Sequence, residues 1–123
     1  MKEKNLEITI LLDYYGGVLT EKQREVIELY YEDDLSLSEI AEHSGITRQG
    51  VRDAIKRGEN TMLELEENLG FVKKMEEYRE KLERISALNE EVEKFNRQNV
   101  YSRYISERTG KINRLTEEEL DGI

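Results

Sequence analysis

The absence of proline is the feature that most narrows what this chain of 123 residues can fold into. A proline ring removes a backbone N–H and clashes with the preceding helical turn, so no position here is closed to an α-helix for that reason. Charged residues make up 38% of the sequence and hydrophobic residues 37%, which is too little apolar material for a large core. Thin layers of amphipathic helix suit this composition, and we expect an all-α protein.

Cysteine is also absent, which excludes disulfides, thiolate metal sites and thiol nucleophiles. His43 is the only histidine, and its place near an expected helix end favours a capping role over a ligand role. The sequence has no glycine-rich phosphate loop, and no serine or threonine has a base partner beyond this histidine. We therefore expect no metal, no cofactor and no enzymatic activity.

The start of the chain offers no targeting or membrane signal. Its apolar run, residues 6–12, is short and includes Glu7. A signal peptide needs a longer apolar segment, and a membrane span needs about 20 apolar residues. We expect a soluble, cytoplasmic protein with no membrane partner.

Helix boundaries are well marked in the first half of the chain. Capping boxes at residues 20–23 and 36–39 predict the starts of two helices, because in each box two side chains satisfy free backbone N–H groups reciprocally. Thr47 is expected to cap a further helix that runs to about residue 68. Before these, residues 5–15 are expected to form a first helix. Its buried face is either Leu6, Ile10 and Tyr14, or Ile8, Leu11, Leu12 and Tyr15.

Residues 37–56 meet the requirements of a helix-turn-helix. The two helices can cross closely only at a small residue, here Ala41, and the turn needs a residue that tolerates positive φ, here Gly45. Gly50 and Gly58 weaken the second helix, and Gly50 is expected where another group approaches closely. Apolar residues before, within and after the turn supply a shared core: Leu37, Ile40, Ile46, Val51 and Ile55.

Residues 19–27, 37–41 and 45–52 resemble region 4 of bacterial sigma factors, the module that reads the −35 promoter element. The chain is more similar to the small YlxM-like family of helix-turn-helix proteins, which are encoded beside genes of the signal recognition particle. This similarity is carried by Asp13-Tyr14-Tyr15, residues 29–37, residues 48–57 and the long helix that follows. It spans roughly residues 5–95. It implies a regulatory role connected with the signal recognition particle pathway.

In a DNA-bound helix-turn-helix, the first residues of the second helix meet the bases. Arginine can bond guanine, and glutamine can bond adenine, through two hydrogen bonds each. The expected base contacts are Thr47, Arg48, Gln49 and Arg52, with Lys56 and Arg57 reaching phosphates. Residues 46–58 hold four basic residues and one acidic residue, a local charge of +3 on a chain of −9, so the remainder carries −12. We prefer DNA contact, with a pure packing unit or a protein-docking surface as the alternatives.

A fifth helix is expected from Phe71 to about residue 96. Large apolar residues spaced by four and three form a stripe along it, as in the seam of a coiled coil. The stripe consists of Phe71, Met75, Tyr78, Leu82, Ile85, Leu88, Val92 and Phe95. It could fold back on the first four helices or pair with another chain, and its solvated opposite face favours a homodimer.

The sequence thus predicts three parts: a helix-turn-helix domain over residues 1–68, a long amphipathic helix over residues 69–96, and a tail over residues 97–123. The tail has a capping box at residues 116–119 but ends soon after it, so we expect it to be partly mobile. The preferred function is a DNA-binding regulator linked to the signal recognition particle. The alternative is an adaptor that does not bind DNA and instead binds protein or RNA components of that particle.

Overall fold

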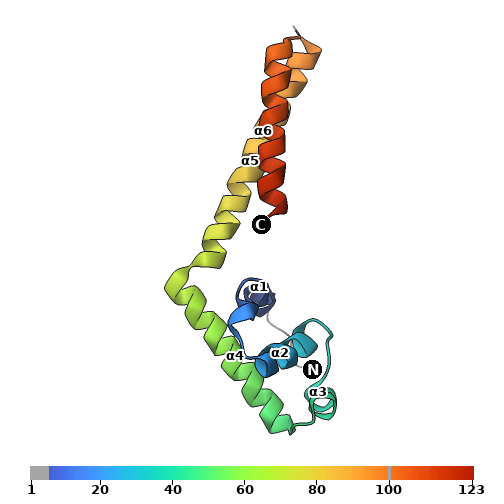
Figure 1. Ribbon diagram of the computed structural model, residues 1–123, viewed down its shortest axis with the longest axis vertical. Coiled ribbons are helices and arrows are strands. Elements are labelled where there is room, and N and C mark those ends of the chain that lie inside the picture. The colour runs from blue at the N-terminus through green and yellow to red at the C-terminus, as the bar shows by residue number, and fades with distance from the viewer. Residues whose placement is uncertain (1–5, 100) are drawn as a thin grey trace. The chain divides into compact units, whose positions relative to one another are not determined.

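The computed structural model describes residues 6–99 and 101–123, and these residues form helices and no strand (Figure 1). The expectation of an all-α fold is confirmed. The chain divides into two compact units, one ending at Val72 and the other starting at Lys73. The helices are α1 (Leu6–Tyr15), α2 (Glu21–Tyr31), α3 (Leu37–Ser44), α4 (Arg48–Leu69), α5 (Phe71–Gln98) and α6 (Arg103–Asp121), with one 3₁₀ turn, η1 (Gly16–Val18).

The capping boxes predicted at residues 20–23 and 36–39 are both formed. The hydroxyl of Thr20 accepts a hydrogen bond from the backbone N–H of Gln23, and the Gln23 side chain accepts one from the backbone N–H of Thr20, each over 3.2 Å. Ser36 and Glu39 exchange the equivalent bonds over 3.1 and 3.0 Å. Because these N–H groups have no partner inside the helix, the caps fix where α2 and α3 begin.

The core of the first unit lies where α1, α2 and α3 pack against α4. Of the two possible faces of α1, the structure buries the one that contains Ile8, whereas Leu6 and Ile10 on the other face are 79% and 45% exposed. Helix α4 is therefore the common base of this unit. The fully buried side chains are Ile8, Leu11, Val26, Ile27, Ile40, Val51 and Met62.

The close approach of helices in this unit occurs at Gly58. This glycine is buried, and a Cβ built on it would lie 2.2 Å from Cδ1 of Ile27 in α2. At Gly50, where the sequence suggests a close approach, a Cβ would lie 3.2 Å from the hydroxyl of Thr47, the residue that caps the same helix. Among the described residues, then, Gly58 rather than Gly50 admits a neighbouring helix.

The second unit is an antiparallel pair formed by α5 and α6 (Figure 1). Buried and partly buried residues recur along both helices at alternating spacings of three and four, and we call this set the seam. Most of its members are polar. The seam consists of Met75, Arg79, Leu82, Ser86, Asn89, Glu93 and Asn96 on α5, of Ser102 at the N-cap of α6, and of Ser106, Thr109, Asn113, Thr116 and Leu120 on α6.

Most of the apolar stripe predicted along α5 does not pack on α6; only Met75 and Leu82 belong to the seam. Leu82 is its only member buried in the second unit, and Leu88, Val92 and Phe95 are 62%, 52% and 69% exposed. Asparagines take the seam instead, because they bond to the backbone of the segment that faces them. The Nδ2 of Asn89 donates to the carbonyl oxygen of Thr109 over 2.8 Å.

The segment over residues 97–123, expected as a partly mobile tail, contains the whole of α6. The helix passes through Gly110, because one glycine costs only about 1 kcal/mol relative to alanine and the seam packs on both sides of it. The capping box predicted at residues 116–119 is wrong. Thr116 lies buried inside α6, and its hydroxyl donates to the carbonyl oxygen of Ile112 over 3.0 Å.

Candidate nucleic-acid interface

The turn between α3 and α4 is three residues long and is closed by backbone hydrogen bonds. Gly45 ends α3 in the left-handed region with φ of 67°, a conformation that favours glycine. The N–H of Ile46 then donates to the carbonyl oxygen of Ala41 over 3.2 Å. The hydroxyl of Thr47 accepts from the N–H of Gly50 over 2.9 Å and so starts α4. The predicted helix-turn-helix geometry is thus present in full.

Packing against α3 fixes the start of α4, and a contact from α2 holds the end of α3. Ile40 of α3 and Val51 of α4 are completely buried, and Ile55 follows one turn later. From α2, the Nζ of Lys22 donates to the carbonyl oxygen of Ser44 over 3.4 Å. This contact completes the last turn of α3, where carbonyl groups lack partners inside the helix. Sequence reasoning missed it, because Lys22 and Ser44 meet only after the three helices pack.

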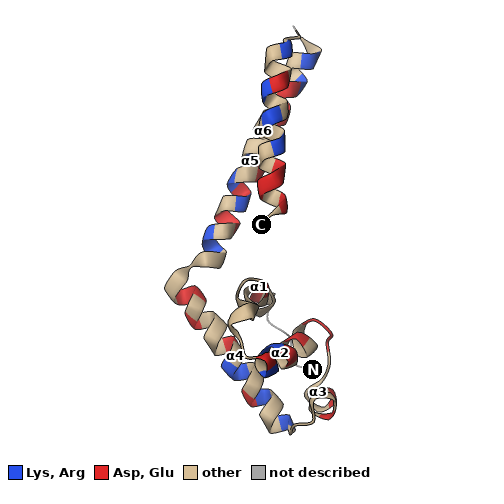
Figure 2. Ribbon diagram, viewed as in Figure 1, with Lys and Arg blue, Asp and Glu red and all other residues tan. Residues whose placement is uncertain are grey.

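Three basic residues form a row along the exposed side of α4. Arg48, Arg52 and Lys56 are spaced by four residues, so they lie one turn apart, and all three are exposed. Within the described part of the chain, no carboxylate forms an ion pair with any of them. Figure 2 shows the basic residues of α4 near its start and acidic residues further along. The row therefore presents positive charge that the described residues leave unneutralised.

Gln49 lies beside this row and is held by a neighbour. Its Nε2 donates to Oδ1 of Asp53 over 2.9 Å, across one turn of α4. A glutamine amide has two N–H donors and one acceptor oxygen. The bond to Asp53 uses one donor and leaves one donor and the acceptor, which is the pair that the edge of adenine requires in the major groove.

Two of the predicted site residues stand apart from the row. The hydroxyl of Thr47 is engaged in the cap of α4, as described above. Arg57 follows Lys56 directly, so it projects about 100° further round the helix, next to Gly58 where α2 crosses. The structure thus brings together Arg48, Gln49, Arg52 and Lys56, and it separates Arg57 from them.

Two tyrosines tie the second half of α4 to the helices that pack on it. The hydroxyl of Tyr31 donates to Oε1 of Glu59 over 2.5 Å, and that of Tyr15 donates to Oε1 of Glu66 over 2.6 Å. Burial, followed by the hydrogen bond to the carboxylate, raises the pKa of both phenols above the ordinary value of 10.0. These bonds tie Glu59 and Glu66 to the helices that pack on α4, whereas the basic residues of its first half are exposed.

The described residues offer little for other kinds of site. They contain no group of three or more histidine, aspartate or glutamate side chains that could hold a metal ion. None of their helices combines the length and the apolar character that crossing a lipid bilayer requires.

Comparison with known families shows to which family this chain belongs. The model of the UPF0122 family, described as "Putative helix-turn-helix protein, YlxM / p13 like", matches residues 2–107. The chain belongs to this family. The matched range extends from before α1 into the first turns of α6, so the rest of α6 lies beyond the UPF0122 match.

Individual UPF0122 proteins are similar over most of that length. One from Caldanaerobacter subterraneus subsp. tengcongensis is 51% identical over 85 residues, which cover 69% of this chain and 73% of the relative. One from Thermoanaerobacter sp. strain X514 is 48% identical over the same length and shares. One from Desulforamulus reducens is 55% identical over 74 residues, or 60% of this chain and 62% of the relative.

Proposed function

We propose that this UPF0122 protein is a DNA-binding regulator that places the start of α4 in the major groove. The observation that carries the proposal is the exposed row of Arg48, Arg52 and Lys56 on the second helix of a helix-turn-helix. In such units the recognition helix directs its first residues at base edges. Arg48 and Gln49 are therefore the proposed base contacts, with Arg52 beside them and Lys56 on a phosphate.

The charge distribution of the chain favours binding to particular DNA sites over binding to DNA of any sequence. A net charge of −9 repels the phosphate backbone at a distance, so a basic row along one helix has to make its contacts at close range. Arg57 and Thr47 complete the proposed set, Arg57 as a phosphate contact from the neighbouring side of α4 and Thr47 as the residue that positions its first turn.

We also propose a role for each of the three parts of the chain. We infer that residues 1–68 are the DNA-binding domain and that the helix over residues 69–96 and the tail over residues 97–123 serve association with a second copy. The protein would act in the cytoplasm as a homodimer that regulates transcription. The suggested connection with the signal recognition particle rests on resemblance to the YlxM-like family.

The test is fluorescence anisotropy with the upstream DNA of the protein's own operon and a scrambled duplex, at low and at physiological salt. We expect tighter binding to the operon fragment and weaker binding at higher salt. Arg48→Ala should cost about 1–3 kcal/mol of discrimination between the two duplexes. Lys56→Ala should weaken binding to both duplexes alike and reduce the slope of log affinity against log salt concentration by about one. Wild-type behaviour of both variants would contradict the groove model.

A second function is favoured by one observation, the charge of −12 outside residues 46–58. An acidic helical body could bind a basic partner, so the alternative is an adaptor for protein or RNA components of the signal recognition particle. Capture of purified particle protein by the folded chain, together with equal and weak binding to both duplexes, would favour this adaptor over the DNA-binding regulator.

A further inference from the structure

The α5–α6 pair carries its apolar side chains on its outside. Among the described residues from Lys73 onward, Leu82 is the only buried large apolar side chain, at 9% exposure. Ten others are exposed to between 38% and 69%. We call them the apolar face: Tyr78, Ile85, Leu88, Val92 and Phe95 on α5, and Tyr101, Tyr104, Ile105, Ile112 and Leu115 on α6 or just before it.

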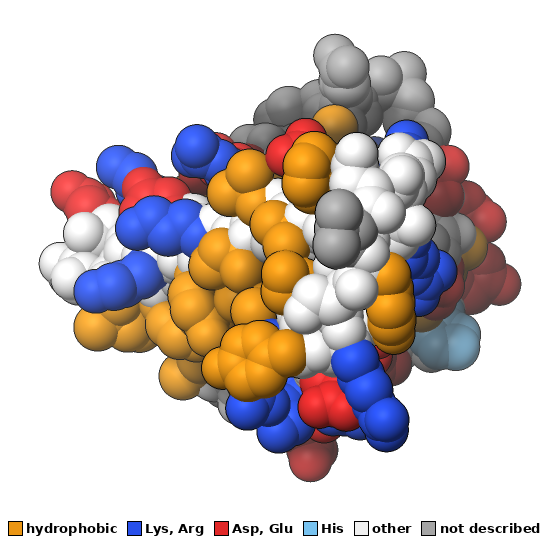
Figure 3. Space-filling view, turned by 90° about the horizontal axis from the view of Figure 1, so that it is seen from above, with side chains coloured by type: hydrophobic (Ala, Val, Ile, Leu, Met, Phe, Trp, Pro, Cys, Tyr) orange, Lys and Arg blue, Asp and Glu red, His pale blue; other side chains and the backbone are white. Residues whose placement is uncertain are grey.

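Nine of these ten side chains lie on one side of the pair. All but Tyr104 stand one position before a seam residue, as Val92 stands before Glu93. In two antiparallel helices, positions that precede the seam on one helix lie beside those that precede it on the other. The structure agrees with this geometry, because Val92 and Phe95 of α5 and Ile105 of α6 line one hollow between the helices. Figure 3, seen from the end where α5 leads into α6, shows hydrophobic side chains gathered into one patch.

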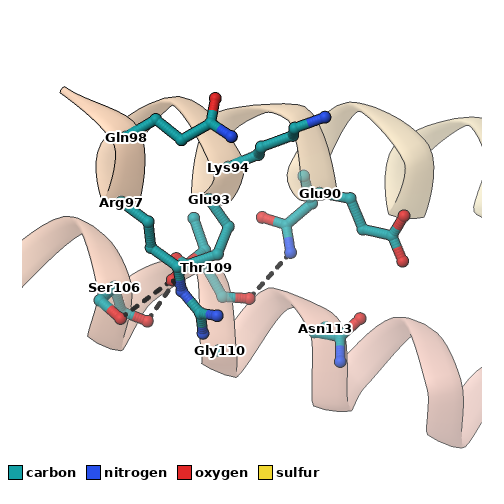
Figure 4. A pocket seen from close by; sticks show the side chains of 10 residues that line it. Glu90, Glu93, Lys94, Arg97, Gln98, Ser106, Thr109, Gly110 and Asn113 are labelled. Atoms are coloured by element: carbon teal, nitrogen blue, oxygen red, sulfur yellow. Dashed lines mark hydrogen bonds and ion pairs between the residues drawn. The ribbon is translucent and has the colours of Figure 1, made fainter.

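The other side of the pair is polar. Positions that follow seam residues hold charged side chains throughout, except for Ala87 and Gly110. Figure 4 shows this side, where Glu90, Lys94 and Arg97 project from α5 around an open pocket. Within the pocket, Glu93 accepts hydrogen bonds from Thr109 and Ser106. The two helices together thus form one amphipathic layer with a charged side and a mostly apolar side, which also holds Lys74, Lys81, Arg108 and Glu119.

The seam between the helices does not remove this apolar face from water. Ser102 donates its N–H to Oδ1 of Asn96, and Nδ2 of Asn96 donates back to the carbonyl oxygen of Ser102, each over 2.9 Å. Such bonds fix how α5 and α6 face each other, but they bury little apolar surface. Exposed apolar patches larger than several hundred Å² mark interaction sites in soluble proteins.

We propose that the apolar face packs against the same face of a second copy of this chain, so that two α5–α6 pairs form a four-helix bundle. At about 200 Å² for a fully exposed large apolar residue, the face presents on the order of 1,000 Å². A stable interface buries about 800 Å² on each partner. Two amphipathic helix pairs that meet by their apolar sides reproduce the layering of a four-helix bundle.

Charge also favours a second copy as the occupant. Residues 73–123 hold 11 basic and 12 acidic residues, a net charge of −1, whereas residues 1–72 carry the remaining −8. The second units of two copies of the chain can therefore approach each other without strong repulsion. The inference rests on the proposed homodimer and assigns its interface, to which α6 contributes side chains as well as α5.

The test is the mass of the full chain in solution, measured by sedimentation equilibrium without DNA. We expect twice 14.5 kDa at micromolar concentration. Phe95→Lys and Leu88→Lys should each raise the dissociation constant by about thirtyfold or more, as expected for apolar anchors at the centre of an interface. Glu90→Gln changes the charge by the same amount on the polar side and should leave the mass unchanged. Circular dichroism checks that each variant keeps its helices.

Because the chain has no cysteine, single cysteines provide a second readout. Val92→Cys should be joined to its copy by a short bis-maleimide, whereas Glu90→Cys should not. A wild-type chain that stays monomeric at high micromolar concentration would overturn the proposal, and so would binding of that monomer to anionic vesicles in place of its copy. A dimer that fails to bind DNA would leave this interface intact and contradict only the DNA-binding proposal.

Discussion

Gly58 of α4 and Ile27 of α2 lie so close that no other residue fits at position 58 without movement. A Cβ on Gly58 would stand 2.2 Å from Cδ1 of Ile27. Ile27 is completely buried, so its terminal methyl group can turn away only by displacing other side chains of a close-packed core. The glycine therefore sets how closely the helix that precedes the helix-turn-helix packs on the recognition helix.

Gly58→Ala should lower the free energy of unfolding by about 1–2 kcal/mol, because overpacking outweighs the helix propensity that alanine gains. Gly110→Ala is the matched control, since nothing lies within 4 Å of a Cβ built on Gly110. That change should stabilise its unit by about 1 kcal/mol. Urea unfolding followed by circular dichroism measures both. Stabilisation by Gly58→Ala would show that the contact with Ile27 is not tight.

Tyr31→Phe should destabilise the first unit by about 1 kcal/mol at neutral pH, because the carboxylate of Glu59 loses its hydrogen bond. The pKa of Tyr31 is raised above its ordinary value of 10.0, first by burial. The unfolded state therefore ionises first, and this contribution to stability is complete below pH 10 and declines above it. Stability measured between neutral and alkaline pH should fall less steeply in Tyr31→Phe. Parallel curves for the two proteins would contradict the raised pKa.

Glu39 should make the helix-turn-helix sensitive to acid. The backbone N–H of Ser36, and then its hydroxyl, lower the pKa of Glu39 below the ordinary value of 4.5. The charged form is favoured in the folded state, so its contribution is present above pH 4.5 and is lost as the pH falls through the folded pKa. Glu39→Gln keeps a capping partner without the charge and should flatten that loss. Thermal unfolding across acidic pH measures the difference, and an unchanged profile would argue against the cap.

Asp53→Ala should separate affinity from discrimination. Removing this carboxylate takes a negative charge from beside the basic row, so binding to every duplex should tighten at low salt. Gln49 would also lose the partner of its Nε2, and discrimination at the base it contacts should fall. Anisotropy titrations with duplexes altered one base pair at a time measure both effects. Asp53→Asn removes the charge but keeps an acceptor, and it should preserve the discrimination. Loss of discrimination in Asp53→Asn as well would contradict the positioning role.

The first half of the fold could be predicted from the sequence because its signals are local. Ser36 and Glu39 lie three residues apart, and their reciprocal bonds depend only on backbone that is already helical. Gly45 likewise ends α3 through its own φ. The tertiary contacts of the site, such as Lys22 with Ser44, join residues 22 positions apart and leave no pattern in either segment.

The sequence alone does not predict the packed side of α5, because an apolar and a polar heptad pattern run along this helix, mostly one residue apart. The apolar pattern, which contains Val92, predicts the packed side, yet the polar pattern that contains Glu93 is the one that packs on α6. Asn89 fits there because it bonds to the backbone of α6, a partner that hydrophobic periodicity does not register. Thr116 fits inside α6 because its hydroxyl bonds to the carbonyl oxygen of Ile112 in the same helix, a partner that the capping pattern over residues 116–119 does not register.

The central claim, that the basic row of α4 contacts DNA, is tested most directly by nuclear magnetic resonance of the isotopically labelled full chain titrated with duplex DNA at low salt. Amide shifts should change from Ile46 to Arg57, and Arg48→Ala with Lys56→Ala should abolish most of the change. The amides of α5 should stay unaffected. Shifts confined to α5 and α6, or none at all under conditions where the helices persist, would contradict the claim.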